Sequence, residues 1–419
     1  MALLGLTVPS ETESMTITRG SRDQELKPVV VAPVVSRRPV LKGIGVAAAT
    51  ALMAGTGLLS YRVVDKAALN PGGGDAYAPW KTWSDDSGPR GAVAAAVLAA
   101  NPHNTQPWKF AVTDGAIDVD TDLARTIGAV DPVRREQQVG LGCTLENLVL
   151  ACGIRGLGPT VDLLPGGVSG DRVAHVTLTP GPAAPSPLYE AIGRRHTNRG
   201  EYDGRAVSPA TLAELVDTRG LDGVTVHWVT GSSDMATMGQ LLIDAAYALT
   251  QDEQQSRDSF GWYRADNDAV QAHRDGITLD AQGMSPIVLG IAKLLPAQSR
   301  SSGDSFWVGQ TRTLHTKTAA AYGVITAADA YDRRSQLNAG RLLQRIHLTA
   351  TTLGVALQPM NQITERIDRE RVTGAAATFG PRFGALLPPD AQPLVTFRVG
   401  YPVRDARPSP RRTLAAVTR

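Results

Sequence analysis

The chain has 419 residues, of which 42 % are hydrophobic and 20 % are charged. This is the composition of an ordinary globular protein, so it excludes a chain that is disordered throughout and leaves room for one large or two medium domains. The formal net charge is +2. Residues 1–66 carry 8 Lys and Arg and 5 Asp and Glu, which leaves 34 cations against 35 anions in the remainder. A nucleic-acid partner is therefore not expected.

The N-terminal region contains the first specific motif. Residues 36–42 read SRRPVLK, and the Ala- and Gly-rich apolar run IGVAAATALMAGTGLL follows at 44–59. The pattern resembles a twin-arginine export signal, Ser-Arg-Arg-x-Phe-Leu-Lys, with Val40 in place of Phe. The apolar run is shorter than the roughly 20 residues of a spanning helix. We predict a tail disordered over 1–35 and a signal over 36–62.

The resemblance to an export signal implies the twin-arginine export machinery as a partner and a location in the cell envelope. No clear Ala-x-Ala cleavage site follows Leu59. Residues 44–59 could therefore stay attached as an N-terminal membrane anchor. The alternative is a chance Arg-Arg pair before an apolar helix.

Neither the cysteines nor the histidines form a pattern that binds metal. Cys143 and Cys152 are nine residues apart on one predicted helix, which turns them to roughly opposite faces, so no disulfide is expected between them. The seven histidines are scattered, without an HExxH or a paired CxxC motif. We predict no metal site.

Beyond the signal, residues 63–91 are rich in Gly, Pro and Asp and are predicted to form a linker. An alanine-rich helix is expected over 92–100. Helical patterns separate the predicted strands, so the class is a mixture of α and β. Strand-like segments lie at 109–112, 116–119, 173–178, 224–229, 321–326 and 394–400.

Two segments far apart in the chain are similar to each other. Residues 134–158, RREQQVGLGCTLENLVLACGIRGLG, align with 333–354, RRSQLNAGRLLQRIHLTATTLG. Gly142 aligns with Gly340, and each segment predicts a long helix closed by glycine. Two unrelated core helices would look alike in their apolar period, but they would not share the Arg-Arg start and the Leu-Gly end. We infer an internal duplication.

Residues 251–316 have no counterpart in the first half. They are polar and carry several aromatic residues, and they fall between a helix and a strand of the second half. An insertion of this length is either a decoration or a lid over a site, and we favour a lid.

Residues 99–110, AANPHNTQPWKF, crowd polar side chains onto one stiff loop. Pro102 and Pro107 fix two φ angles, while Asn101, His103 and Asn104 offer hydrogen-bond donors and acceptors close together. Such a loop suits a flat ligand with several hydrogen-bonding groups. The alternative is an ordinary polar turn after a helix.

Arginines gather in two further segments. GRRHTNRGEYDGRAV at 193–207 places Arg194, Arg195 and Arg199 around Thr197 and Asn198, a combination that suits phosphate oxygens. GYPVRDARPSPRR at 400–412 ends in Arg411 and Arg412. Either segment alone could be a solvated basic stretch.

Taken together, these motifs resemble those of the nitroreductase superfamily of flavin enzymes, and their order is closest to the Acg-type, FMN-binding branch. The resemblance covers roughly 92–415. It is carried by Asn-x-Gln-Pro-Trp-x-Phe at 104–110, Arg-His-Thr-Asn-Arg-x-x-Tyr at 195–202, Leu-Gly-Val-Ala-Leu-Gln-Pro-Met at 353–360 and Gly-Tyr-Pro at 400–402.

The resemblance implies an α+β, nitroreductase-like fold in which each half has a central antiparallel or mixed sheet flanked by helices. Ordinary nitroreductases build each FMN site between two identical subunits, with the arginine motif before the Asn-x-Gln-Pro-Trp motif. Here the order is reversed. We therefore expect a fused pseudo-dimer, with halves at 92–185 and 186–419 and one composite FMN site.

The resemblance also implies roles for individual residues. Arg195 and Thr197 would bind the FMN phosphate together with Arg411 or Arg412, with Asn198 in the same segment and Arg199 near the ribityl chain or the pyrimidine edge. The isoalloxazine would contact the other half. The residues implied there are Asn101, Pro102, His103 and Asn104, with the turn Gln358, Pro359, Met360 and Asn361 near the flavin N5. No catalytic side chain is assigned, because the hydride chemistry belongs to the flavin.

The implied function is an FMN oxidoreductase that moves electrons from a donor such as NAD(P)H to a nitro compound, a quinone or a similar acceptor. The alternative is an exported flavin-binding protein whose lid blocks turnover, which the aromatic insertion and the export signal favour. A degenerate structural protein without flavin is the third interpretation. A fused pseudo-dimer needs no second chain to complete its site, so both monomer and homodimer stay open.

Overall fold

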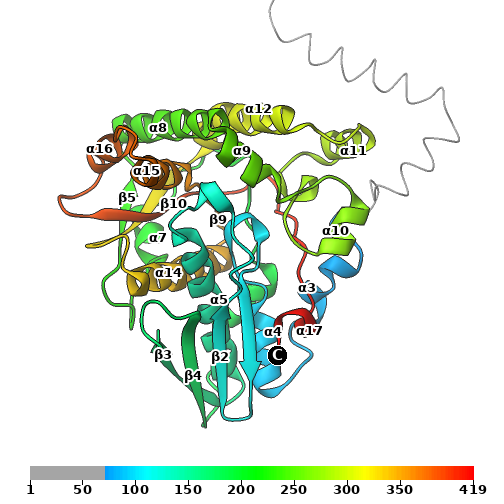
Figure 1. Ribbon diagram of the computed structural model, residues 1–419. Helices are drawn as coiled ribbons and strands as arrows, with labels where there is room; N and C mark the ends of the chain where they lie inside the picture. The colour runs from blue at the N-terminus through cyan, green and yellow to red at the C-terminus, as the bar shows by residue number, and fades with distance from the viewer. Residues whose placement is uncertain (1–70) are drawn as a thin grey trace, which may run out of the picture. The chain divides into compact units, whose positions relative to one another are not determined.

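The computed structural model describes residues 71–419. The predicted tail, the export signal and the first part of the predicted linker lie outside these residues. Figure 1 shows the arrangement of the elements. The described helices are α3 (Pro79–Thr82), α4 (Gly88–Ala96), α5 (Arg135–Ile154), α6 (Pro187–Ala191), α7 (Pro209–Glu214), α8 (Ser232–Gln251), α9 (Glu253–Phe260), α10 (Asn267–His273), α11 (Pro286–Leu294), α12 (Arg300–Gln310), α13 (Thr316–Thr318), α14 (Arg333–Thr352), α15 (Gln362–Thr373), α16 (Phe379–Gly384) and α17 (Leu414–Val417).

The first half contains one antiparallel sheet with the strand order β1-β2-β4-β3. Its strands are β1 (Trp108–Val112), β2 (Ala116–Thr121), β3 (Leu157–Leu163) and β4 (Arg172–Pro180). Helix α5 lies between β2 and β3 in the chain. The inward side chains Trp108, Phe110, Ile117 and Val119 are fully buried, as expected for strands with one face on a core.

The second half repeats this topology. Its antiparallel sheet has the order β5-β8-β10-β9, and α14 lies between β8 and β9, as α5 lies between β2 and β3. The strands are β5 (Thr225–Val229), β8 (Ala321–Ala327), β9 (Ala356–Pro359) and β10 (Gln392–Gly400). The two related halves and the antiparallel sheets that the sequence predicts are confirmed.

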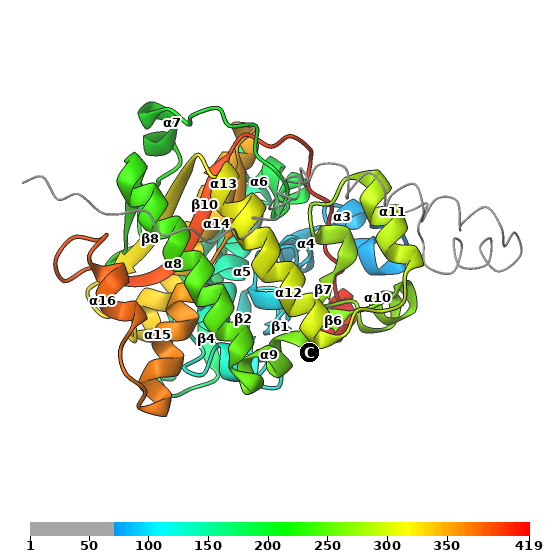
Figure 2. The ribbon, with the colours of Figure 1, turned by 90° about the horizontal axis from the view of Figure 1, so that it is seen from above.

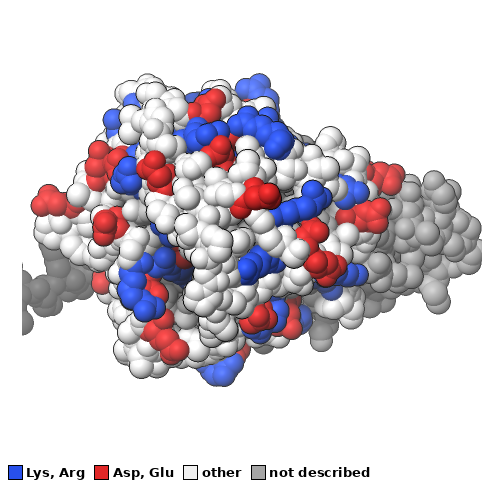
Figure 3. All heavy atoms as spheres, turned by 90° about the horizontal axis from the view of Figure 1, so that it is seen from below, with Lys and Arg blue, Asp and Glu red and all other residues white. Residues whose placement is uncertain are grey.

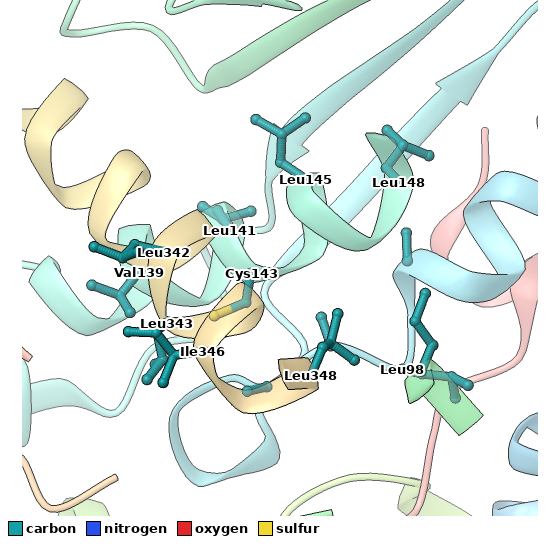
Figure 4. Packing of buried hydrophobic residues seen from close by; sticks show 14 of the residues in the cluster. Leu98, Val139, Leu141, Cys143, Leu145, Leu148, Leu342, Leu343, Ile346 and Leu348 are labelled. Carbon is teal, nitrogen blue, oxygen red and sulfur yellow. The ribbon is translucent and has the colours of Figure 1, made fainter. Parts of the chain in front are cut away.

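Helices α5 and α14 cross at the glycines that the internal repeat aligns. A Cβ added to Gly142 would collide with the carbonyl oxygen of Leu337, and one added to Gly340 would collide with that of Val139. The two contacts are reciprocal, because each partner lies three residues before the other helix's glycine, as in a two-fold interface. Val139, Cys143, Leu343 and Ile346 surround the crossing and form part of one core that spans both halves (Figure 4).

The ends of these two helices follow from local chemistry. The Asp332 carboxylate caps α14 by accepting a hydrogen bond from the Ser335 amide at 2.8 Å. Gly354 follows α14 with φ 68°, and Gly156 follows α5 with φ 69°. The predicted helix over 134–158 therefore ends earlier, at Ile154, and its last residues begin β3 instead.

The six predicted strands are all present, while β3 and β9 of the two main sheets were not predicted. β3 contains Gly158 and Pro159, and β9 reads ALQP, so both lack the run of β-branched residues that marks a strand. They form because they pair with the long neighbouring strands β4 and β10.

The predicted linker over 63–91 is not a linker in its described part. Residues 75–96 form the short helix η1 (Asp75–Tyr77), then α3 and α4. Tyr77 and Trp80 are buried in the core, and the Trp80 indole donates a hydrogen bond to the Ser409 carbonyl at 2.7 Å. Pro79 lies in the first turn of α3 and Pro89 in the first turn of α4. The prolines of this segment therefore mark the starts of helices and not a linker.

Residues 251–316 fold into helices α9 to α12 and the small parallel pair β6 (Tyr263–Arg264) and β7 (Ile277–Thr278). Asp252, Asp266, Ser285 and Ser299 cap the four helices. Seen from above in Figure 2, α8 and α12 lie across α5 and α14. The insertion therefore covers the layer in which the two long helices meet.

The cysteines, the surface charges and the apolar character of the helices complete the description of the fold. Cys143 and Cys152 are buried and unpaired, as predicted. On the face in Figure 3, Lys and Arg are interspersed with Asp and Glu over the described residues. No helix within 71–419 combines the length and the apolar character that crossing a membrane requires.

Candidate functional site

A cavity of about 260 Å³ lies between the two halves and beneath the insertion. Its volume is close to the lower end of ligand pockets, roughly 300–1,000 Å³. The first half contributes Asn101, Pro102 and His103 together with residues of α5. The second half contributes Thr197, Arg199 and the segment 358–362. Motifs that are distant in the sequence therefore meet at one place.

The loop after α4 is held in a strained conformation. His103, Asn104 and Gln106 all have φ between 46° and 56°, the left-handed region that costs a non-glycine residue about 1–2 kcal/mol. The Gln106 amide donates to the Asn101 carboxamide oxygen at 2.8 Å, which closes the loop on itself. The conformation directs Asn101 and His103 to the cavity.

Partners from other parts of the chain hold this loop. Asn104 donates to the Pro410 carbonyl at 2.9 Å and accepts from the Arg411 guanidinium at 2.6 Å. Gln106 donates to the Arg274 carbonyl at 2.9 Å. Gln106 and Trp108 are fully buried and do not line the cavity. Asn104 also does not line the cavity, and its side chain anchors the loop instead.

Arg199 is the cation of the cavity wall. One of its amino groups donates to the Ala281 carbonyl at 3.2 Å, and no carboxylate of the described residues forms an ion pair with it. Burial lowers its pKa to about 10, so it stays charged at neutral pH. Arg199 and Thr197 also line a second, smaller cavity of about 210 Å³. A half-buried cation without an internal anion favours an anionic ligand.

Arg195 and Arg411 are not brought to the cavity wall. Arg195 donates to the Leu98 carbonyl at 2.9 Å, and Arg411 donates to the carbonyls of Leu98 and Ala99, both at 3.2 Å. These carbonyls follow the end of α4, where cations are favoured. The Trp80 ring lies 5.9 Å from Arg195 and 4.8 Å from Arg411. Each arginine keeps one buried Nε without a hydrogen-bond partner.

Asn198 and Arg412 also lie away from the cavity. The Asn198 amide donates to the Arg404 carbonyl at 2.8 Å, and its oxygen accepts from the Gly200 amide at 2.8 Å. Arg412 binds Gln106 through its backbone amide and its guanidinium. Both residues shape the loops around the cavity.

The segment after β9 forms one wall. Gln358, Pro359, Met360 and Asn361 line the cavity, as the resemblance requires of a segment near a bound flavin. The fully buried Arg398 donates to the Gln358 oxygen at 2.8 Å, which leaves the Gln358 NH₂ group as a donor. The Asn361 oxygen accepts from the Thr396 amide at 2.9 Å. The orientation of both amide side chains is thereby set by β10.

Two buried carboxyl groups that the sequence analysis missed line the far end of the cavity. Glu136 of α5 is 7 % exposed and Glu365 of α15 is 8 % exposed, and both line the cavity. Burial and the Glu136 charge hold the pKa of Glu365 well above its usual range, and burial also raises the pKa of Glu136. Glu136 looked like an ordinary acid of a first helical turn.

The histidines of the cavity are neutral at pH 7. Burial, with a smaller contribution from Arg199, lowers the pKa of His103 to about 4. Burial, Arg398 and Arg199 together lower the pKa of His315 to about 3. His103 Nε2 lies 2.9 Å from the Ser259 hydroxyl of α9, which connects the polar loop to the insertion.

The insertion supplies the aromatic part of the lining. Phe260, Tyr263, Phe306 and Trp307 come from α9, β6 and α12. Phe260 and Tyr263 stack with ring centroids 5.6 Å apart. The cavity is therefore polar at the loop, cationic at Arg199, acidic at α15 and apolar beneath the insertion. Within 71–419, no group of three His, Cys, Asp or Glu side chains is placed to hold a metal ion.

Comparison with known proteins gives two similar relatives. The chain is 26 % identical over 338 residues to a protein of Mycobacterium tuberculosis strain H37Rv that is provisionally named an NAD(P)H nitroreductase. The match covers 78 % of this chain and 90 % of that protein, and the corresponding protein of strain CDC 1551 matches equally. No protein-family model matches the chain. The relatives support the resemblance to the nitroreductase superfamily.

Among solved structures, similar chains include a nitroreductase with bound FMN from Desulfitobacterium hafniense, 13 % identical, with a TM-score of 0.36. That match covers 56 % of this chain and 99 % of the other. An FMN- and NADPH-dependent nitroreductase of a Sphingopyxis strain is 18 % identical with a TM-score of 0.35, covering 55 % and 96 %.

Proposed function

We propose that the chain is an FMN-dependent oxidoreductase of the nitroreductase type, which takes electrons from a donor such as NAD(P)H and passes them to a nitro compound, a quinone or a similar acceptor. One observation carries the proposal. Asn101 and His103 of the first half and Thr197, Arg199 and Gln358 of the second line the same cavity. The name of the mycobacterial relatives supports the same class.

The residues present fit FMN. The ring would lie between the loop 101–103 and the segment 358–361, where the Gln358 NH₂ group and His103 offer hydrogen bonds to its polar edge. Arg199 and Thr197 would meet the ribityl phosphate. Each charge-assisted bond to the phosphate contributes about 1.5–3 kcal/mol before desolvation. The bound flavin would supply the hydride chemistry.

Arg195 and Arg411 would act on the phosphate from behind the wall. Both are buried, neither has a carboxylate partner among the described residues, and burial lowers the pKa of each, to about 10 for Arg195. An anion near them would stabilise their charged forms. Their roles are therefore electrostatic support for the phosphate and capping of α4.

Two further parts of the proposal concern the chain as a whole. The shared strand order and the reciprocal glycine contacts support a fused pseudo-dimer. The order of the sequence motifs is the reason for proposing the Acg-type branch. The motif at 36–42 supports export through the twin-arginine machinery to the cell envelope. Replacing both Arg37 and Arg38 with lysine tests the export. The protein should then stay in the cytoplasm instead of reaching the cell envelope.

The visible spectrum of the purified full chain tests the main proposal. A flavin band, or one that develops after FMN is added and free FMN is removed, is expected. Rapid mixing of the loaded protein with NADPH should then bleach the band within seconds. A chain that retains no FMN under these conditions would contradict the proposal.

The second candidate function is storage of flavin without turnover. The specific observation in its favour is the aromatic cover over the cavity, with Phe260 and Trp307 contributed by the insertion. Under this alternative the loaded protein binds FMN tightly, yet NADPH bleaches it no faster than free FMN. The same mixing experiment therefore separates the two functions.

A further inference from the structure

We propose that helix α11 (Pro286–Leu294) docks on a lipid membrane through an exposed apolar side. This contact is separate from the proposed electron transfer and needs no FMN, and it rests on the proposed export only for the identity of the membrane. Soluble proteins commonly expose single apolar side chains, but a contiguous exposed group marks a site of interaction. In Figures 1 and 2, α11 lies at the edge of the described part of the chain, near α10.

The exposed apolar side chains of the protein are concentrated at α11. The helix reads PIVLGIAKL, and Leu295 follows it directly. Ile287, Val288 and Leu295 are 77 %, 54 % and 57 % exposed. The other large hydrophobic side chains that are exposed within 71–419 each stand alone in their segments, and they are Leu123, Val168, Tyr247, Val372 and Val403.

The helix has an apolar outer side and an attached inner side. Successive residues of a helix are turned by about 100°, so Ile287, Val288 and the partly buried Ile291 lie on one side. Leu289 and Lys293 lie on the opposite side, and Leu289 is buried against the protein. The outer side of α11 is therefore a stripe of large apolar side chains that faces solvent.

The first described residues of the chain are fixed beside α11. The Asp280 carboxylate forms an ion pair with Lys293 of α11 at 2.6 Å and accepts a hydrogen bond from the Gly72 amide at 2.8 Å. The apolar run 44–59, the proposed signal or anchor, ends 13 residues before Gly72. A chain of that length spans at most about 45 Å. A membrane that holds this run therefore lies within reach of α11.

The size of the apolar side favours a lipid surface over a second protein chain. A helix of nine residues is about 14 Å long and about 10 Å wide. One side of it offers far less than the roughly 800 Å² that each partner buries in a stable protein interface. A helix on a membrane needs no such area, because it sinks its apolar side about 5–10 Å into the boundary between headgroups and acyl chains. A lipid surface is therefore the occupant that fits α11.

A label on α11 of the full chain tests the contact. Val288→Cys carries a polarity-sensitive dye, and Val372→Cys on α15 is the matched control, because the two valines are 54 % and 48 % exposed. Cys143 and Cys152 are buried, so the dye reacts with the introduced thiol. On addition of vesicles of phosphatidylcholine and phosphatidylglycerol, the emission of the dye at position 288 should shift to the blue and lose its quenching by iodide. The dye at position 372 should show neither change.

A second variant tests whether the apolar side chains carry the contact. The dye is placed on Leu295→Cys, with and without Ile287→Asn in the same chain. Ile287→Asn should lower the ratio of protected to unprotected dye on the order of 10-fold, because an amide replaces a buried hydrocarbon group. Ile287 is exposed, so the fold should be unchanged, and the circular dichroism spectrum checks this.

Three results would overturn the lipid contact. The first is a dye at position 288 that changes no more than the dye at position 372. The second is protection without lipid that grows with protein concentration, which means that a second copy covers α11. The third is protection without lipid at every concentration, which means that the chain itself covers the helix.

Failure of the proposed function is measured separately. A chain that retains no FMN would defeat the proposed oxidoreductase and leave the vesicle result unchanged. A chain found only in the cytoplasm would remove the export, while the dye at position 288 would still decide whether α11 contacts lipid.

Discussion

The two halves share a strand order but differ in their connections, and the difference locates the site. In the first half, β1 and β2 are joined by a tight turn at 113–115, and β3 and β4 by residues 164–171. In the second half the corresponding connections hold α8 to α13 and α15 with α16. The cavity lies against these additions. A repeated fold thus supplies the frame, and the unequal connections decide which side of it becomes a site.

The two halves are most alike where α5 and α14 cross. Disrupting this crossing should have the largest effect on the free energy of unfolding. Gly142→Val or Gly340→Val places a side chain against the backbone of the other helix, which cannot move aside. We expect a loss of more than about 3 kcal/mol in the free energy of unfolding. Chemical denaturation measures it.

Gly153→Ala is the control for this prediction. Gly153 lies on the same helix α5, where an added Cβ would meet the Ala184 side chain at 3.9 Å, an ordinary contact. Its stability should stay close to that of the parent or rise slightly. If Gly142→Val were equally stable, the close crossing of the two helices would be wrong.

Arg199, which the second half contributes to the cavity wall, should have the largest effect on FMN affinity. Arg199→Ala removes the charge from the cavity wall, and we expect FMN to bind about 10- to 150-fold more weakly, the equivalent of 1.5–3 kcal/mol. Quenching of FMN fluorescence measures the dissociation constant. Arg194→Ala in the exposed neighbouring position should leave FMN affinity unchanged. Equal affinity of the Arg199 variant would remove this residue from the FMN site.

Glu365, which is buried in the cavity wall, should make stability depend on pH. The pKa of Glu365 is higher in the folded chain than in the unfolded one, so its contribution to stability is lost as pH rises above the unfolded value. Glu365→Gln mimics the protonated form at every pH. The variant should therefore gain stability relative to the parent as pH rises, by at most about 1.4 kcal/mol per pH unit.

Melting temperatures from about pH 5 to 9 measure this difference. Asp131 contributes a background of the same sign, because burial and the Glu136 charge raise its pKa to about 7. Glu370→Gln, at another buried glutamate of α15, reports changes that do not involve Glu365. A constant difference between parent and Glu365→Gln across this range would contradict the assignment.

The smallest effect concerns the contact between the first half and the insertion. Ser259→Ala removes the hydroxyl that lies 2.9 Å from His103. Loss of one such hydrogen bond, about 0.5–1.5 kcal/mol, should speed release of FMN roughly 2- to 10-fold if the insertion acts as a lid. Dilution of the loaded protein with flavin fluorescence as the signal measures the rate. Ser301→Ala on the exposed side of α12 should not change it.

Local patterns in the chain predicted much of the frame. Apolar alternation marked the strands around 109–112 and 394–400, and the aligned Gly142 and Gly340 indicated the duplication. In the structure the same two glycines lie at the contact between α5 and α14. The strands β3 and β9 escaped prediction because pairing with neighbours, not their own composition, makes them strands. The same is true of residues 71–91, whose packing depends on partners far along the chain.

The sequence by itself determined which chemistry is available: a stiff polar loop, an arginine-rich segment and a Gln-Pro turn, each visible as a local pattern. Only the tertiary structure decided which of those side chains meet. It brings Arg199 to the cavity, while Arg195 and Arg411 turn to the carbonyls after α4. It also places Glu136 of α5 and Glu365 of α15 in the wall of one cavity, and no local pattern encodes that placement.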